Sequence, residues 1–129
     1  MENEYQHTDL TSEIIKRFYI VYNKLGYGFL EKVYERSLKI ELEKAGFFVE
    51  SQKPIQVFYE NQIVGEYFAD LLVENKVILE LKAAETICEE HGNQLINYLK
   101  ATEIEVGLLL NFGKKPEIKR KAYSNINKP

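Results

Sequence analysis

The sequence predicts an α/β fold in a single domain that spans residues 1–129, and three observations support this prediction. Apolar residues at helical spacing fill the first third of the chain, and shorter strand-like runs follow them. The apolar run at 77–81 indicates a strand that is buried on both faces. A helical segment separates this run from a second one at 106–110, as expected for two parallel strands joined by a crossover.

The N-terminal half is expected to hold two helices behind a loose lead-in of residues 1–10. The first helix begins near Leu10, with Thr11 or Ser12 as its N-cap. Glycines in the sequence Leu25-Gly26-Tyr27-Gly28 are expected to end it. The second helix is expected from Phe29 to Ala45, and its buried stripe consists of Leu30, Val33, Tyr34, Leu38 and Leu42.

Strand signals begin at Phe47, where the apolar period changes. Strands are expected at 47–49, 55–59, 63–73 and 76–82, with Gly65 as the site of a bulge and turns at 60–62 and 74–76. A helix at about 88–101 and a short central strand at 106–110 complete the series.

The stretch from Tyr67 to Ala84 places charges inside two apolar strands. If the turn at 74–76 holds three residues, Val73 faces Val77, and Asp70 faces Glu80 on the same side of the hairpin. Facing like charges destabilise a strand pair, and burial of an unpaired carboxylate costs several kcal/mol or more. A divalent cation held by Asp70 and Glu80, with Lys82 beside it, would offset that cost. The alternative is a buried structural salt bridge between Lys82 and one of the two carboxylates.

The pattern Glu-x-Lys is not specific by itself, because Glu74-Asn75-Lys76 and Glu117-Ile118-Lys119 repeat it in solvated contexts. Other polar residues also have ordinary explanations. Glu31 is by default a solvated carboxylate of a first helical turn, and Gln94 and Tyr98 share one helix edge. His91, beside two glutamates, is expected to be solvated rather than a ligand.

The densest basic region follows Asn111 and leaves two interpretations open. It forms either a solvated tail or final edge strand, or a patch that contacts phosphates. The residues of the patch are Lys114, Lys115, Lys119, Arg120 and Lys121.

Composition narrows the function classes. The net charge of −3 is unlike that of a protein that coats nucleic acid by charge alone. The single cysteine, Cys88, excludes an internal disulfide and favours a reducing compartment. No apolar run approaches the roughly 20 residues that a membrane helix needs, and the N-terminus is unlike a secretory signal. A cytoplasmic protein is therefore expected.

Taken together, the element order and its motifs resemble the PD-(D/E)xK nuclease superfamily. Asp70 is followed after nine residues by Glu80-Leu81-Lys82, although Ala69 stands where the superfamily often has proline. The residues from Gln94 to Tyr98 match the Gln-x-x-x-Tyr pattern of its RecB-like and lambda-exonuclease-like branch. Gly28, Glu31 and Tyr34 fit the signature of the GxxExxY proteins, a group within the superfamily. The resemblance covers the chain from about Leu10 to Tyr123.

The resemblance implies a restriction-endonuclease-like core, with a mixed sheet of about four strands flanked by helices. It also implies hydrolysis of phosphodiester bonds in DNA with Mg²⁺ or Mn²⁺. The implied metal ligands are Asp70, Glu80 and the carbonyl of Leu81, with Glu31 as a further ligand. Lys82 would orient the attacking water or stabilise negative charge, and Gln94 and Tyr98 would position the phosphate.

A second hypothesis of a different class stays open, namely a binding or assembly module that keeps this fold without catalysis. The acidic balance of the chain favours it. The nine tyrosines also leave two uses open, because they are suited to stack on bases or to line the interface of a homodimer.

Overall fold

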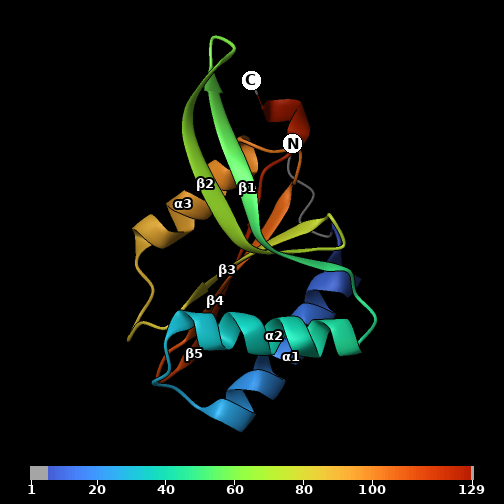
Figure 1. Cartoon of the computed structure of the whole chain (residues 1–129), viewed down its shortest axis with the longest axis vertical. Helices are drawn as coiled ribbons and strands as arrows, with labels where there is room; N and C mark the ends of the chain where they lie inside the picture. The colour runs from blue at the N-terminus through green and yellow to red at the C-terminus, as the bar shows by residue number, and fades with distance from the viewer. Residues whose placement is uncertain (1–5, 129) are drawn as a thin grey trace.

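The computed structural model describes residues 6–128 and confirms the predicted α/β architecture, a mixed sheet with helices on both faces (Figure 1). The elements, in chain order, are α1 (Thr8–Leu25), α2 (Glu31–Lys44), β1 (Val49–Tyr59), β2 (Gln62–Val73), β3 (Val77–Lys82), α3 (Glu89–Lys100), β4 (Val106–Phe112), β5 (Pro116–Ala122) and a short 3₁₀ turn, η1 (Asn125–Asn127).

The five strands lie side by side in the order of the chain. Strands β3 and β4 pair in parallel through the α3 crossover, as predicted, and the other neighbours are antiparallel. The sheet has five strands rather than about four because the charged C-terminal segment forms the edge strand β5, which pairs with β4. Both faces of β3 are buried, as its continuous apolar run predicts.

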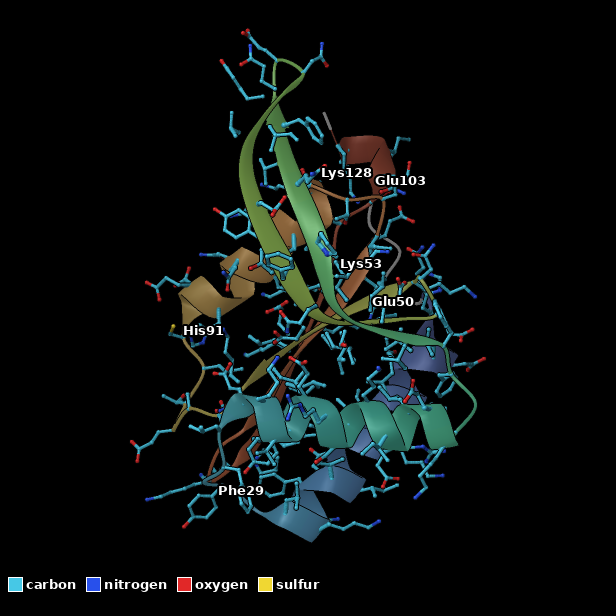
Figure 2. All side chains as sticks on the ribbon, viewed as in Figure 1. Phe29, Glu50, Lys53, His91, Glu103 and Lys128 are labelled. Atoms are coloured by element: carbon cyan, nitrogen blue, oxygen red, sulfur yellow. The ribbon has the colours of Figure 1, made fainter. Side chains whose placement is uncertain are left out.

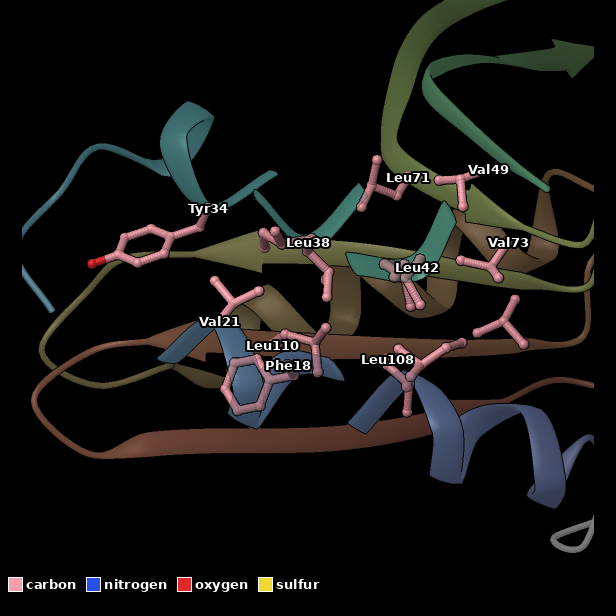
Figure 3. Close-up of a cluster of buried hydrophobic side chains, with 14 of the residues drawn as sticks. Phe18, Val21, Tyr34, Leu38, Leu42, Val49, Leu71, Val73, Leu108 and Leu110 are labelled. Atoms are coloured by element: carbon pink, nitrogen blue, oxygen red, sulfur yellow. The ribbon is translucent and has the colours of Figure 1, made fainter. Parts of the chain in front are cut away.

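Two apolar clusters hold the sheet between its helices. Helices α1 and α2 cover one face, where Phe18, Leu38 and Leu42 pack against Leu108 and Leu110 of β4 (Figure 3). Helix α3 covers the other face with Leu95, Tyr98 and Leu99. It approaches β4 closely at Gly107, where an added Cβ would lie 2.7 Å from Leu95 Cδ1.

The predicted register of the β2–β3 hairpin is confirmed, with Val73 opposite Val77 and Leu71 opposite Leu79. This pairing stops after Leu79, whereas β1 and β2 continue to pair with each other to the turn at Glu60 and Asn61. Residues 53–69, here called the arm, therefore project beyond the rest of the sheet (Figure 1). A register shift next to Gly65 marks the expected bulge.

The first helix begins earlier than predicted. Helix α1 begins at Thr8, and its N-cap is His7 in the left-handed conformation (φ 57°) rather than Thr11 or Ser12. Thr11 is buried inside the helix, and its hydroxyl donates to the Thr8 carbonyl oxygen at 3.1 Å. Of the predicted lead-in, residues 8–10 are helical, and residues 1–5 lie outside the described part of the chain.

The buried stripe of α2 also differs from the prediction. Tyr34, Leu38 and Leu42 are buried as expected, but Leu30 precedes the helix and is 81% exposed, and Val33 is 37% exposed. Glu35 is buried instead, at 6% exposure. The helix therefore turns a carboxylate toward the sheet at its N-terminal end.

Within residues 6–128, no helix is long and apolar enough to cross a membrane. The assignment of the whole chain to one domain stays a prediction.

Candidate functional site

The backbone ladder between β2 and β3 ends at the two acidic residues that the sequence singled out. The N–H of Asp70 donates to Glu80 Oε1 at 3.2 Å, and the N–H of Leu81 donates to Asp70 Oδ2 at 2.8 Å. Each carboxylate thus bonds to the backbone of the opposite strand where the ladder opens. The predicted facing of Asp70 and Glu80 is therefore present, and it places two carboxylates at the base of the arm.

Both carboxyl groups are held in an environment that disfavours their charges. Burial, followed by the negative charge of Asp70, raises the pKa of Glu80 to about 8, and Glu80 is only 5% exposed. The pKa of Asp70 is raised, mainly by burial and further by the charges of Glu35 and Glu31, although the N–H of Leu81 opposes this. A proton or a bound cation would therefore stabilise the pair at neutral pH.

Lys82 lies on the same face of β3 as Glu80, because residues two apart share a face of a strand. Its charge lowers the pKa of both Asp70 and Glu80, so it lies near them. Among the described residues, however, no ion pair joins Lys82 to either carboxylate. The buried salt bridge considered as the alternative is therefore not present in this arrangement.

A buried asparagine that the sequence analysis did not select holds the segment after Lys82. Asn111 is 0% exposed. Its side chain accepts from the N–H of Ala84 at 3.0 Å and donates to the carbonyl oxygen of Ala84 at 2.9 Å. This pair of bonds fixes the C-terminal end of β3 to β4, next to the site.

Helix α2 contributes acidic residues from the other side of the site. Glu31 is exposed in the first turn, and its charge reaches both Asp70 and Glu80. Glu35, one turn later, accepts a hydrogen bond from Gln52 Nε2 at 2.8 Å, and the same amide lies 3.5 Å from Asp70 Oδ1. Gln52 thus bridges a carboxylate of α2 and a carboxylate of β2.

The backbone of Gln52 is strained in this position. It has a φ of 53° within β1, in the left-handed region that non-glycine residues rarely occupy. Glu50 and Lys53 flank it with an ion pair of 2.9 Å (Figure 2). Glu35 could have been found from its i+4 spacing to Glu31. Gln52 carries no signal in the sequence, because its role depends on the register between β1 and β2.

The residues Gly28 and Tyr34 shape the loop that precedes Glu31. Gly28 has a φ of 111°, which favours glycine. The buried Tyr34 hydroxyl donates to the Gly26 carbonyl oxygen at 2.7 Å and accepts from the N–H of Phe29 at 3.2 Å. The tyrosine therefore ties the loop to α2 and sets where Glu31 begins the helix.

Gln94 and Tyr98 lie on α3, and both line a cavity between α3 and the arm. Tyr98 is 6% exposed, and its pKa is raised to about 12 by burial and then by the charges of Glu80 and Asp70. The Tyr98 hydroxyl therefore lies near the acidic pair. His91 accepts from the N–H of Cys88 at 3.2 Å as part of the α3 cap, at the N-terminal end of the helix (Figure 2).

The basic residues of the C-terminal region do not form one surface. Lys114 and Lys115 lie in the β4–β5 turn, at the end of the sheet where β3 also ends. Along β5 the side chains alternate, so Lys119 and Lys121 face the α3 side. Arg120 faces the other side and donates to the carbonyl oxygen of Gln6 at 2.6 Å. The five predicted basic residues are therefore divided between the β4–β5 turn, the α3 side of the sheet and the opposite side.

The donor atoms of the site suit a hard divalent cation. Asp70 and Glu80 offer carboxylate oxygens, and Mg²⁺ is commonly bound through one or two carboxylates while it keeps several waters. Across residues 6–128, no three His, Cys, Asp or Glu side chains gather closely enough to hold a metal ion. The assignment of Glu31 and of the Leu81 carbonyl as further ligands thus stays a prediction.

Comparisons with known proteins agree with this fold. The family model described as the PD-(D/E)XK nuclease superfamily matches residues 8–121. The crystal structure of SSO0001 has a similar fold, with a TM-score of 0.58 and 15% identity. The match covers 72% of this chain and 50% of that one, so this chain spans about half the length of SSO0001. A comparison with curated protein sequences finds no match.

Proposed function

This chain belongs to the PD-(D/E)XK nuclease superfamily, and on that premise we propose that it is a metal-dependent nuclease that hydrolyses phosphodiester bonds in DNA. One observation carries the proposal. Asp70 and Glu80, two acidic residues inside an apolar hairpin, face each other where the β2–β3 ladder opens, and each bonds to the other's strand. Facing buried carboxylates destabilise a fold, and a bound cation reverses that effect.

In this proposal Asp70, Glu80 and the carbonyl of Leu81 hold Mg²⁺ or Mn²⁺, with Glu31 as a further ligand, directly or through water. The bound cation would polarise the phosphate and lower the pKa of a bound water. Gln52 holds the Asp70 carboxylate in place from the side of β1, through the amide that also bonds to Glu35.

The remaining polar residues act on the substrate. The Lys82 ammonium, which is not engaged in an ion pair within the described residues, stabilises negative charge that develops on the phosphate or orients the attacking water. Gln94 and Tyr98 donate hydrogen bonds to the phosphate from α3. Lys114 and Lys115, at the end of the sheet where β3 ends, contact neighbouring phosphates, with Lys119 and Lys121 on the α3 side.

The motifs support a finer placement within the superfamily. Gly28, Glu31 and Tyr34 support membership of the GxxExxY group, because the glycine and the tyrosine together shape the loop before Glu31. Gln94 and Tyr98, which lie one helical turn apart on α3 with Tyr98 near the acidic pair, support the RecB-like and lambda-exonuclease-like branch.

A non-catalytic binding module is the second candidate function. The observation in its favour is that, within the described residues, the acidic side chains do not gather as a group of three that could hold a metal ion. This candidate predicts that the protein binds a partner or nucleic acid but cleaves nothing in the presence of Mg²⁺ or Mn²⁺.

Cleavage of labelled single-stranded, duplex and branched DNA, and of RNA, distinguishes the two candidates. We expect cutting that requires Mg²⁺ or Mn²⁺ and that Asp70→Asn and Lys82→Ala both abolish. Lys76→Ala is the matched control, because Glu74-Asn75-Lys76 has the same Glu-x-Lys spacing in an exposed turn. Cutting that survives both site substitutions contradicts the assignment of the site. A calorimetric titration that shows no Mn²⁺ binding, together with no cutting, favours the binding module.

A further inference from the structure

A groove of about 730 Å³ lies between the arm and α3. The two elements run beside each other in Figure 1. The volume falls within the range of roughly 300–1,000 Å³ that is typical of ligand sites. Its lining residues come from both elements, including Val57, Phe58 and Tyr67 of the arm and Tyr98 of α3.

The lining combines aromatic rings with side-chain amides. Phe58 is 56% exposed and Tyr67 is 46% exposed, so each presents much of its surface to solvent. The Tyr67 ring lies 5.7 Å from that of Tyr98, centroid to centroid. Gln56, Asn93, Gln94 and Asn97 supply amide donors and acceptors, whereas Glu90 and Lys100 supply opposite charges. This chemistry fits flat, uncharged groups with hydrogen-bonding edges better than it fits phosphates.

Tyr98 connects the groove with the candidate site. Gln94 and Tyr98 line the groove, and Tyr98 also lies near the carboxylates of Glu80 and Asp70. A chain of nucleotides with one phosphate at the acidic pair would therefore place its neighbouring bases between the arm and α3.

We propose that this groove binds the unpaired bases of a nucleic-acid strand, with Phe58 and Tyr67 stacking on the bases and the amides of Asn93 and Asn97 contacting their edges. The inference rests on the proposed nuclease function and names its substrate class. In a duplex the base faces are stacked on one another, so only an unpaired strand can offer them to these rings. DNA and RNA strands share this chemistry.

The test measures binding in EDTA, where no cleavage occurs, by fluorescence anisotropy. The probes are labelled single-stranded oligo(dT) and oligo(rU), a duplex of the same length, and a DNA strand with several consecutive abasic positions. A base stacked on an aromatic ring contributes roughly 1–3 kcal/mol to binding, so Phe58→Ala and Tyr67→Ala should each weaken single-strand binding about 5-fold or more. The abasic strand should lose a similar factor.

Two other aromatic residues of the arm provide matched controls. Tyr59 is 67% exposed and Phe68 is 46% exposed, and neither lines the groove. Tyr59→Ala and Phe68→Ala should therefore change binding less than 2-fold. Comparison of oligo(dT) with oligo(rU) shows which strand the groove prefers.

Four results would overturn the inference. They are duplex binding tighter than single-strand binding, equal losses in the control variants, undiminished binding of the abasic strand, and a groove variant that changes the oligomeric state in light scattering. Metal-dependent cleavage of duplex without single-strand binding removes the inference and leaves the proposed function intact. The absence of both cleavage and binding removes both.

Discussion

At the residue scale, the negative charges of Asp70 and Glu80 destabilise the folded state unless a proton or a cation balances them. Glu80 is almost fully buried, and its carboxylate accepts the N–H of Asp70. A carboxyl whose pKa is higher in the folded state than in the unfolded state binds more protons when folded. The free energy of unfolding therefore falls as the pH rises between the two pKa values.

Glu80→Gln is expected to remove most of this pH dependence. In EDTA, the free energy of unfolding of the wild type should fall as the pH rises from the ordinary value of 4.5 toward the raised pKa of about 8. The variant should change much less over that interval, and at pH 8 it should be more stable than the wild type by on the order of a few kcal/mol. Urea unfolding across the pH range measures both. Glu66→Gln, on the exposed arm, is the control and should keep the wild-type slope. Equal slopes for the wild type and Glu80→Gln would contradict the prediction.

Gln52→Gly is expected to separate stability from metal binding. Glycine accepts a φ of 53° without strain, so the substitution relieves roughly 1–3 kcal/mol of backbone strain, offset by the roughly 0.5–1 kcal/mol that glycine loses in chain entropy. Stability should change little, because loss of the 2.8 Å hydrogen bond to the buried Glu35 opposes this gain. The bridging amide is lost, however, and loss of a group that orients a ligand typically weakens metal affinity about 10–100-fold. Urea unfolding and a calorimetric Mn²⁺ titration measure the two effects.

Glu60→Gly, at the tip of the arm, is the matched control for Gln52→Gly, because Glu60 also has a positive φ, of 48°. It should relieve strain without any change in Mn²⁺ affinity. A Gln52→Gly protein that binds Mn²⁺ as the wild type does would show that the amide does not position Asp70.

At the scale of the elements, the loop between α1 and α2 decides where Glu31 lies. Tyr34→Phe keeps the ring, which stacks on Phe112 at 4.3 Å, but removes the hydroxyl that bonds to Gly26 and Phe29. We expect a loss of about 1–2 kcal/mol in the free energy of unfolding. Amide hydrogen exchange should show faster opening of the loop. Tyr19→Phe, at a 39% exposed tyrosine of α1, should cost much less, and an equal loss there would argue against a special role for the Tyr34 hydroxyl.

The sequence predicts the elements best where local rules decide them. The three-residue turn at 74–76 determines the hairpin register, and the facing of Asp70 and Glu80 follows from it. The helix starts are less predictable because tertiary contacts override local capping preferences. Thr11, a good N-cap by residue type, is buried within α1, and Leu30 stays exposed in the loop that Tyr34 holds.

In the candidate site, too, only the side chains that are close in the sequence can be grouped in advance. Side chains that share a strand or a helical turn, such as Glu80 with Lys82 and Gln94 with Tyr98, can be grouped from their spacing alone. Gln52 and Asn111 cannot, because each reaches a segment that is distant in the sequence: Gln52 contacts Glu35, and Asn111 contacts Ala84. Only the assembled fold brings each of these residues to its distant partner.

At the scale of the whole molecule, the two apolar clusters form the core, whereas the outer half of the arm lies outside it. The cluster under α1 and α2 contains no residue from the arm. The cluster under α3 takes Ile55 and Ala69, both near the base of the arm. Beyond that point most of the apolar side chains of the arm are exposed. The outer half of the arm therefore adds surface rather than core, and stability should depend little on it.

Shortening the arm tests this division. Residues 58–64 can be replaced by Asn-Gly, which forms a tight hairpin turn, between the paired residues Val57 and Gly65. The free energy of unfolding of the shortened protein should lie within about 1 kcal/mol of the wild-type value, because mainly exposed side chains are lost. Its affinity for Mn²⁺ should be unchanged, because Asp70 and Glu80 keep their bonds at the base of the arm. Binding of single-stranded oligo(dT) should weaken at least as much as in Phe58→Ala, since the shortened arm lacks Phe58 and keeps only Gln56, Val57 and Tyr67 of its groove residues. A large loss of stability would show that the arm supports the core, and unchanged strand binding would place the substrate elsewhere on the molecule.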